Sequence, residues 1–254
     1  MSTTIRGLTR SDIVRPLVQV SLDLTSIEDA LRVAAIAVEA GADWLEVGTP
    51  LILACGTDAV RALRREFPGH PLIADLKIMD GGYGEARMYG NAGADAVVVM
   101  GRAHDATIER VCEAAAEFGL MVMGDDMGAA NHAAEAVRLE SLGVELVVHH
   151  IGHDHRSRHR ELGLSPLTDL REIVASTTVP VQAVGGLSLE QAVACPSYGA
   201  SVVVLGAPLA ISDEDSFTVP EGDLLGVLEP AIREIHAASI RANQQPEQPR
   251  GATQ

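Results

Sequence analysis

The chain has 254 residues, enough for one large domain or two small ones. Its 35 Asp and Glu against 19 Lys and Arg give a formal net charge of -16, which would repel a nucleic acid. No apolar run approaches the roughly 20 residues that cross a bilayer, residues 1–16 are too polar for a secretory signal, and the three cysteines have no paired spacing. We therefore expect a cytoplasmic protein with no nucleic-acid or membrane partner.

Eight short apolar runs follow one another along the chain, with amphipathic segments between them. The runs, each expected to hold a buried strand, lie within residues 17–23, 40–48, 71–77, 92–100, 120–126, 142–150, 179–186 and 198–206. Helical spacing of apolar residues is found in 27–40, 107–118, 131–141 and 188–194. Strands that alternate with helices in this way predict a parallel sheet.

Four of the runs repeat one pattern, in which a glycine ends a helix and a buried strand follows. The glycines are Gly41, Gly93, Gly143 and Gly199, at steps of 52, 50 and 56 residues. Each step is about two strand–helix units long, so the units are evenly spaced. Eight even units predict a closed (β/α)8 TIM barrel. A doubly wound open sheet is the alternative, but it gives no reason for the even spacing.

The predicted barrel occupies residues 1–238 as a single domain. Residues 239–254 are polar and rich in Gln and Pro, which predicts a disordered tail. An acidic loop, residues 212–223, follows the last strand. Either a solvated loop or a lid over a site fits that composition.

Polar residues or glycines stand at the carboxyl ends of nearly all the predicted strands. In chain order they are Asp23, Glu46, Gly48, Asp75, Lys77, Asp80, Asp125, Asp126, His149, His150, Gly185, Gly186 and Gly206. In this fold the reacting groups lie at the carboxyl ends of the strands. Ionised groups inside a barrel are costly unless they are paired or bound to a metal. The pattern therefore indicates an active site at that mouth.

The segment DLKIMD, residues 75–80, is the most informative of these ends. Asp75 and Lys77 are two residues apart, so we expect both side chains to face the barrel mouth. The Lys77 ammonium would stabilise negative charge on a substrate oxygen, and Asp80 would hydrogen-bond to that lysine or to substrate. Glu46 and Asp75, on adjacent strands, offer the oxygen ligands that Mg²⁺ prefers. A structural ion-pair network is the alternative.

The last strands carry glycines and histidines. Gly185, Gly186 and Gly206 lie where the loops after strands 7 and 8 often bind phosphate through backbone N–H groups. Only alternate residues of a strand point inward, so either His149 or His150 faces the site, where it would act as a general base. We expect the other histidines of the 149–159 cluster to be solvated. A zinc site there is conceivable but lacks HExxH or cysteine partners.

With these residues in hand, the chain resembles the orotidine-monophosphate-decarboxylase suprafamily. Within it, the 3-hexulose-6-phosphate synthases are the most similar and the 3-keto-L-gulonate-6-phosphate decarboxylases come next. The matching segments, in order over residues 17–207, are VSLD (20–23), LEVGTPLI (45–52), IADLKIMDGG (73–82), VMGRAHDATI (99–108), VVHHIGHD (147–154), AVGGL (183–187) and VLGA (204–207). IADLKIMDGG contains the DxKxxD signature, the most specific feature.

The resemblance implies a role for each site residue. Asp23 would contact substrate hydroxyls, Glu46 and Asp75 would hold Mg²⁺, and Lys77 would face an enediolate oxygen. Asp125 would position substrate or a water, and His150 would transfer the proton. The phosphate would bind backbone N–H groups of Gly185, Gly186, Gly206 and Ala207. The resemblance also implies a homodimer with active sites at the interface, in which Asp80 reaches into the partner's site.

Departures from the two groups favour one chemistry. The decarboxylases have a glutamate at the position of Asp125 and arginines at those of Ala207 and His153. Against the synthases, Leu53 and Cys55 replace residues that are usually charged, and the pair Asp125-Asp126 is unusual. These differences favour synthase chemistry but leave the exact substrate open.

The first hypothesis is a Mg²⁺-dependent carbon–carbon lyase that acts on a sugar phosphate through an enediolate. It would add formaldehyde to D-ribulose 5-phosphate, reversibly, and form 3-hexulose 6-phosphate. The alternative is a decarboxylase of a β-keto sugar-acid phosphate such as 3-keto-L-gulonate 6-phosphate. A third hypothesis is a non-catalytic barrel that binds a sugar phosphate.

Overall fold

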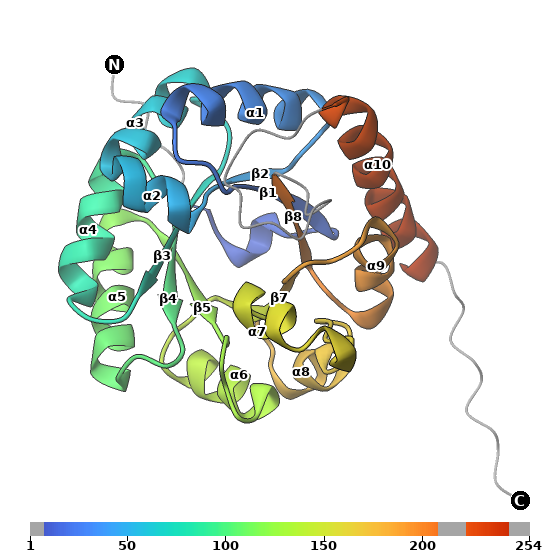
Figure 1. The fold of residues 1–254 in the computed structure, drawn as a ribbon. Coiled ribbons are helices and arrows are strands. Elements are labelled where there is room, and N and C mark those ends of the chain that lie inside the picture. Colours follow the sequence, from blue (N-terminus) through green and yellow to red (C-terminus); the bar gives the residue numbers. More distant parts are fainter. Residues whose placement is uncertain (1–7, 208–221, 244–254) are drawn as a thin grey trace, which may run out of the picture.

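The structure, a computed structural model, describes residues 8–207 and 222–243. Its eight strands form one closed parallel barrel, in which each strand pairs with the next and β8 pairs with β1 (Figure 1). The strands are β1 (Leu17–Leu22), β2 (Trp44–Val47), β3 (Leu72–Ile78), β4 (Ala96–Met100), β5 (Met121–Asp125), β6 (Leu146–His150), β7 (Val181–Val184) and β8 (Val202–Ala207). The predicted TIM barrel is confirmed, and the open sheet is excluded.

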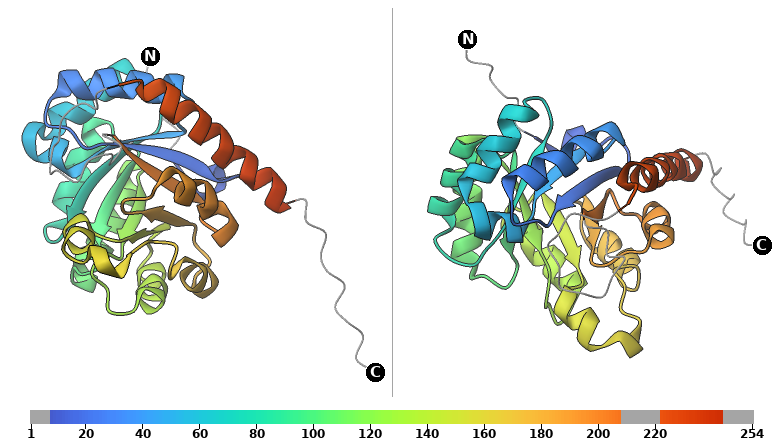
Figure 2. Two further views of the ribbon diagram at one scale, coloured as in Figure 1. Left: turned by 45° about the vertical axis from the view of Figure 1, so that its right-hand side comes forward. Right: turned by 45° about the horizontal axis from the view of Figure 1, so that its top comes forward.

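Most of the helices surround the barrel on its outside (Figure 2). The helices are α1 (Ile27–Glu39), α2 (Thr49–Cys55), α3 (Thr57–Glu66), α4 (Gly82–Ala92), α5 (Asp105–Phe118), α6 (His132–Ser141), α7 (His153–Arg158), α8 (Leu170–Ser176), α9 (Leu189–Ala194) and α10 (Leu224–Asn243). Short 3-10 turns span Arg10–Asp12, Arg160–Leu162 and Cys195–Tyr198. The helical segments predicted at 131–141 and 188–194 each begin one residue before α6 and α9, at the residue that caps the helix. The side chains of Asn131 and Ser188 accept backbone N–H groups of the first turn.

The last helix runs past residue 238, where the predicted barrel domain ends. The polar tail was expected from residue 239, but α10 continues to Asn243, since residues 239–243 contain no Gly or Pro that would end it. Residues 244–254 and nearly all of the acidic 212–223 loop lie outside the described residues. Within the described ranges, no helix is both long and apolar enough to span a membrane.

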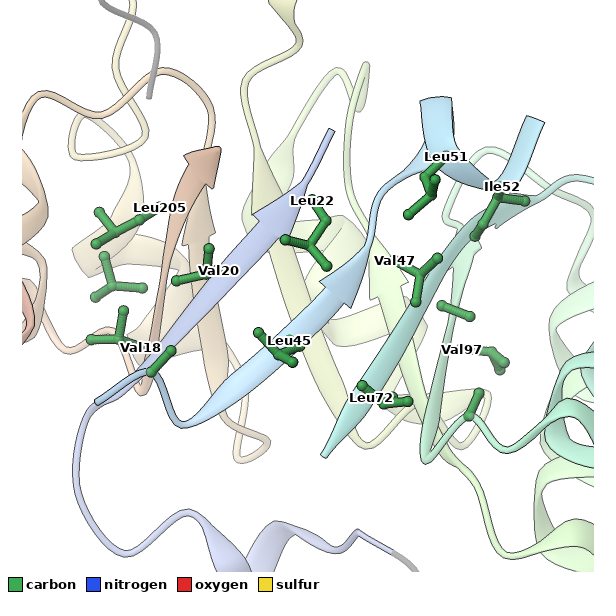
Figure 3. Packing of buried hydrophobic residues seen from close by; sticks show 14 of the residues in the cluster. Val18, Val20, Leu22, Leu45, Val47, Leu51, Ile52, Leu72, Val97 and Leu205 are labelled. Carbon is green, nitrogen blue, oxygen red and sulfur yellow. The ribbon is translucent and has the colours of Figure 1, made fainter. Parts of the chain in front are cut away.

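The core has two layers because successive strand residues point to opposite faces. Val18, Val20 and Leu22 of β1 face outward and pack between the barrel and its helices (Figure 3). A second apolar cluster, which includes Leu17 and Trp44, fills the barrel interior near the amino ends of the strands. Full burial of an aliphatic side chain such as Leu17 stabilises the folded chain by about 1.5–3 kcal/mol. The inward positions that follow Leu17 on β1 are polar and lead up to the mouth.

The sequence repeat has a structural counterpart at the base of the barrel, where the strands begin. The repeats place Asp43, Asp95 and Glu145 directly before β2, β4 and β6. Each carboxylate accepts a backbone N–H near the start of the preceding strand, at 2.8, 2.7 and 3.3 Å respectively. In three of the four repeats a carboxylate therefore ties a strand to the one before it, and the fourth repeat has Ser201 at this position.

Candidate active site

The carboxyl ends of the strands open into a cavity of about 1350 Å³. Nine of the residues singled out from the sequence line it: Asp23, Glu46, Asp75, Lys77, Asp125, His150, Gly185, Gly186 and Gly206. Ala207 ends β8 beside Gly206. Asp80 is different, because it is exposed on the loop after β3 and its Oδ1 accepts the N–H of Gly81 at 2.8 Å.

Neutral side chains hold two carboxylates at the floor of the cavity. Gln182 donates to Gln19 at 3.0 Å, and Gln19 donates in turn to Glu46. The Ser21 hydroxyl lies 2.9 Å from Glu46 Oε1 and 3.1 Å from Asp23 Oδ1. Burial and the charges of Asp75 and Asp23 raise the pKa of Glu46 to about 8. Burial and Asp75 also raise the pKa of Asp23. The floor thus holds more acidic groups than its neighbours alone can keep ionised.

Lys77 supplies the cation nearest to these acids. Its Nζ lies 2.9 Å from Asp75 Oδ2 and 3.3 Å from Asp125 Oδ2, and Thr49 donates to the same Asp75 oxygen at 2.8 Å. Burial opposes the charge of Lys77, but Asp75 and Asp125 outweigh it and raise its pKa. The group therefore stays an ammonium ion, suited to stabilise an anionic oxygen.

The backbone at Lys77 departs from regular strand geometry. Its φ is 47°, in the left-handed region that non-glycine residues rarely adopt. The pairing of β3 with β4 shifts register over the same stretch, between Ala74 and Ile78. Such strain is retained where surrounding structure enforces it, often at functional sites. At this irregular position, the Lys77 side chain lines the cavity together with Asp75.

Asp125 links this lysine to a histidine. It is fully buried, its Oδ2 lies 2.9 Å from His150 Nδ1, and its Oδ1 accepts the N–H of Met127 at 2.8 Å. Burial opposes ionisation of Asp125, but His150 and Lys77 outweigh it and lower its pKa to about 2. An ionised partner at Nδ1 favours the tautomer whose basic nitrogen is Nε2. His150 is therefore oriented to act as a general base.

Another part of the cavity lining combines two glycines with an arginine, groups of a kind that can bind an anion. Gly185 and Gly186 follow β7 with φ values of 123° and 61°, which only glycine adopts readily. A Cβ on Gly186 would lie 1.7 Å from Nη1 of Arg156, so the guanidinium group of this α7 residue lies directly over that glycine. Arg156 also lines the cavity and donates from Nε to Ile151 O at 3.1 Å. Arg156 was not among the residues predicted from the sequence, although an arginine shortly after the sixth strand was the available signal.

Comparison with known proteins identifies the relatives of this site. Residues 16–215 match the model of the orotidine 5'-phosphate decarboxylase / HUMPS family. The chain belongs to this family. A 3-hexulose-6-phosphate synthase from Mycobacterium gastri is 34% identical over 75% of this chain and 90% of its own length. The 3-hexulose-6-phosphate synthase from Methylomonas aminofaciens is 31% identical over 76% of this chain and 90% of its own length.

Solved structures of the family agree with the sequence relatives. The 3-hexulose-6-phosphate synthase of Salmonella typhimurium superposes with a TM-score of 0.74 at 27% identity, over 89% of this chain and 99% of that one. A 3-keto-L-gulonate-6-phosphate decarboxylase from Vibrio cholerae gives 0.73 at 27%, with the same coverage. The protein is thus a carbon–carbon lyase of the orotidine 5'-phosphate decarboxylase / HUMPS family.

One histidine expectation was wrong. Of the pair on β6, His150 faces the cavity, whereas His149 is fully buried on the other side of the strand with Nδ1 2.8 Å from Asp126 Oδ2. His149 is therefore not a solvated residue, because consecutive strand residues face opposite sides and α6 covers that side. His153 and His155, in contrast, are exposed in α7 at the cavity rim.

Proposed function

We propose that this protein is a cytoplasmic, Mg²⁺-dependent 3-hexulose-6-phosphate synthase, which adds formaldehyde to D-ribulose 5-phosphate reversibly. One observation carries the proposal: the buried carboxylate of Asp125 contacts both an ammonium group, Lys77, and an imidazole, His150. An acid–base pair held this way suits proton removal next to a ketone. The identity to named synthases over most of the chain supports the same chemistry.

The cavity has separate places for the two ends of a ketose phosphate. The backbone N–H groups at Gly185, Gly186 and Gly206 and the guanidinium group of Arg156 would bind the phosphate. The carbonyl end would then lie toward Lys77, with Asp23 accepting hydrogen bonds from sugar hydroxyls. Fixing both ends holds the C1 carbon near His150.

The reaction needs one proton to leave and return. His150 Nε2 takes a proton from C1, and the electron pair of that C–H bond forms a C1–C2 double bond. Negative charge then lies on the C2 oxygen, where Lys77 stabilises it. C1 attacks the carbonyl carbon of formaldehyde while the C2 carbonyl re-forms, and His150 returns its proton to the formaldehyde oxygen. The product, 3-hexulose 6-phosphate, contains every atom of both reactants.

The donor set at the cavity floor fits Mg²⁺. Glu46 and Asp75 offer the hard oxygen ligands that this ion prefers, and the raised pKa of Glu46 reflects burial and the uncompensated charge of its acidic neighbours. When bound there, Mg²⁺ would supply Lewis-acid stabilisation of the ketose oxygens. We expect EDTA to abolish turnover, Mg²⁺ to restore it, and Glu46→Gln to prevent that restoration.

The decisive experiment is a substrate test with purified protein. With Mg²⁺, D-ribulose 5-phosphate and formaldehyde, we expect formaldehyde to disappear and a hexulose phosphate to appear by NMR. No formaldehyde consumption at high enzyme loading would overturn the synthase proposal. Release of CO₂ from 3-keto-L-gulonate 6-phosphate would favour the decarboxylase instead. Binding of the sugar phosphate without turnover of either substrate would favour a non-catalytic barrel.

We also propose a homodimer in which Asp80 completes the partner's site. Asp80 is exposed and lies away from the cavity of its own chain, which supports a role in trans. An inactive Asp80→Ala variant mixed with an inactive Lys77→Ala variant should regain activity, because one site of each mixed dimer keeps both residues. No recovery after subunit exchange, or a monomer in light scattering, would contradict this arrangement.

A further inference from the structure

A second polar group lies on the outer side of the barrel wall, next to the proposed catalytic histidine. Asp126 follows β5, His132 begins α6 and His149 lies in β6. One potential ligand atom from each residue lies within 4.8 Å of the others. None of the three contributes to the proton transfer proposed above, so the group needs a separate explanation.

The two imidazoles converge on one carboxylate oxygen. Asp126 Oδ2 lies 2.8 Å from His149 Nδ1 and 2.9 Å from His132 Nδ1. The rings meet edge to face, with centroids 4.8 Å apart and planes at 77°. Asp126 and His149 are fully buried, whereas His132 reaches the cavity. The group is therefore reachable from the cavity through His132.

Hydrogen bonding leaves this group incomplete. Among the described residues, His149 Nε2 has no hydrogen-bond partner, and His132 Nδ1 makes no well-oriented hydrogen bond despite its nearness to Asp126. A buried polar atom left unsatisfied costs about 1–3 kcal/mol. Such atoms often indicate an ion or a water that belongs at the site. Of these two nitrogens, His132 Nδ1 lies beside Asp126 Oδ2, where an ion held by the three residues would satisfy it.

We propose that Asp126, His132 and His149 bind one transition-metal ion of the Zn²⁺ type. Two imidazoles and a carboxylate form a common donor set for such ions. Tetrahedral ligands at zinc distances are roughly 3.3 Å apart. The two 2.8–2.9 Å contacts with Asp126 therefore need to open by only about half an ångström, and the ligand atoms of His132 and His149, which lie within 4.8 Å of each other, need to settle at the same spacing. His132 and Asp169 both line the cavity, so Asp169 or a water from the cavity would supply the fourth ligand.

The site has a structural consequence for catalysis. Asp126 Oδ1 accepts the backbone N–H of His150 at 2.9 Å. An ion on Asp126 would fix this carboxylate and join the ends of β5 and β6 to the start of α6. It would thus act as a positioning element for His150, distinct from the oxygen-lined Mg²⁺ site on the cavity floor.

Metal titration of the full chain tests the proposal without reference to activity. After chelator treatment, and with excess Mg²⁺ to occupy the proposed floor site, we expect one Co²⁺ per chain to give the visible absorption of tetrahedral nitrogen–oxygen coordination, and Zn²⁺ to displace it. Asp126→Asn and His132→Asn should each weaken binding at least 10-fold. His155→Asn, an exposed histidine of α7, and Glu46→Gln, at the floor, should bind Co²⁺ like the parent.

His132→Asn is the central variant because His132 is partly exposed at the first position of a helix, so folding tolerates its replacement. Far-ultraviolet circular dichroism should match the parent. A parent chain that binds no Co²⁺ would overturn the proposal, as would a His132→Asn variant of unchanged affinity. Loss of binding in His155→Asn would also overturn it, by placing the ion on surface histidines.

Discussion

Two carboxylates at the base of the barrel, Asp43 and Asp95, and two at the mouth, Asp23 and Glu46, have opposite surroundings. At the base, Asp43 contacts Arg15 at 2.7 Å and His236 at 2.9 Å, and Asp95 contacts Arg64. Each also accepts a backbone N–H. At the mouth, Asp23 and Glu46 are held mainly by neutral groups, and their pKa values are raised by burial and by neighbouring acids.

The difference separates stability from function within one fold. A buried carboxylate with cations and N–H donors is stable as an anion and ties strands together. Uncompensated carboxylates destabilise the folded chain, and such sites persist where a ligand or metal uses the charge. Replacements at the mouth should therefore change turnover with little loss of stability, and replacements at the base should do the reverse.

The largest expected effect is at the mouth. His150→Gln removes the proposed base while it keeps a polar side chain near Asp125, so kcat for formaldehyde addition should fall by about 10²–10⁴. Affinity for D-ribulose 5-phosphate and the melting temperature should stay close to the parent. His153→Gln, an exposed neighbour, is the matched control and should keep full activity. A His150→Gln variant within 10-fold of the parent would refute the proposed base.

The next effect is at the base. Arg64 donates to Gly93 O and His70 O at 2.9 Å each and contacts Asp95. Arg64→Met leaves that buried carboxylate without its cation, which should cost about 3–5 kcal/mol of unfolding free energy in urea. The kcat of the folded fraction should not change. Arg61→Met, which removes an exposed ion pair with Asp58, should cost under about 1 kcal/mol.

A smaller effect is expected at the phosphate side of the mouth. Arg156→Gln removes one charged partner of the phosphate, worth about 1.5–3 kcal/mol, so KM for the sugar phosphate should rise roughly 10- to 100-fold. The variant kcat should change much less, since Arg156 is proposed to bind the phosphate and not the reacting carbons. Arg158→Gln, on the exposed side of the same helix, should match the parent. Equal KM values for both variants would remove Arg156 from the phosphate site.

Much of the fold was predictable from the sequence because the repeat and the strand pattern both depend on local spacing. Gly41 and its three counterparts mark helix ends, and the acidic residue two positions later at Asp43 and Asp95 marks a strand start. The ring of mouth residues was predictable for the same reason, since parallel strands bring their carboxyl ends together. Asp75 and Lys77 were found this way.

The rest depended on tertiary contacts that spacing does not encode. Alternation along β6 could not decide between His149 and His150, and the partners Asp126 and His132 come from other elements. The positive φ of Lys77 arises from a local register shift. Arg156 reaches Gly186 only because α7 folds back over the end of β7.

The smallest expected effect is a pH-dependent change in folding stability at Asp43, where the strands begin. Burial opposes ionisation of Asp43, but His236, the Val18 N–H and Arg15 outweigh it and lower its pKa. The folded pKa thus lies below the value of about 3.9 expected in the unfolded chain. Stability from the Asp43 anion is therefore present above about pH 4 and lost as pH falls through the folded pKa.

Asp43→Asn should lower the unfolding free energy by about 1 kcal/mol near pH 7, because the Asn oxygen still accepts the Val18 N–H but the charge is lost. The difference from the parent should shrink as the pH falls below about 4, where the parent carboxyl also becomes neutral. Urea unfolding of both chains at several pH values measures it. If the difference in unfolding free energy stayed constant across these pH values, the charge of Asp43 would not be what stabilises the base. The contrast between base and mouth would then lose its electrostatic basis.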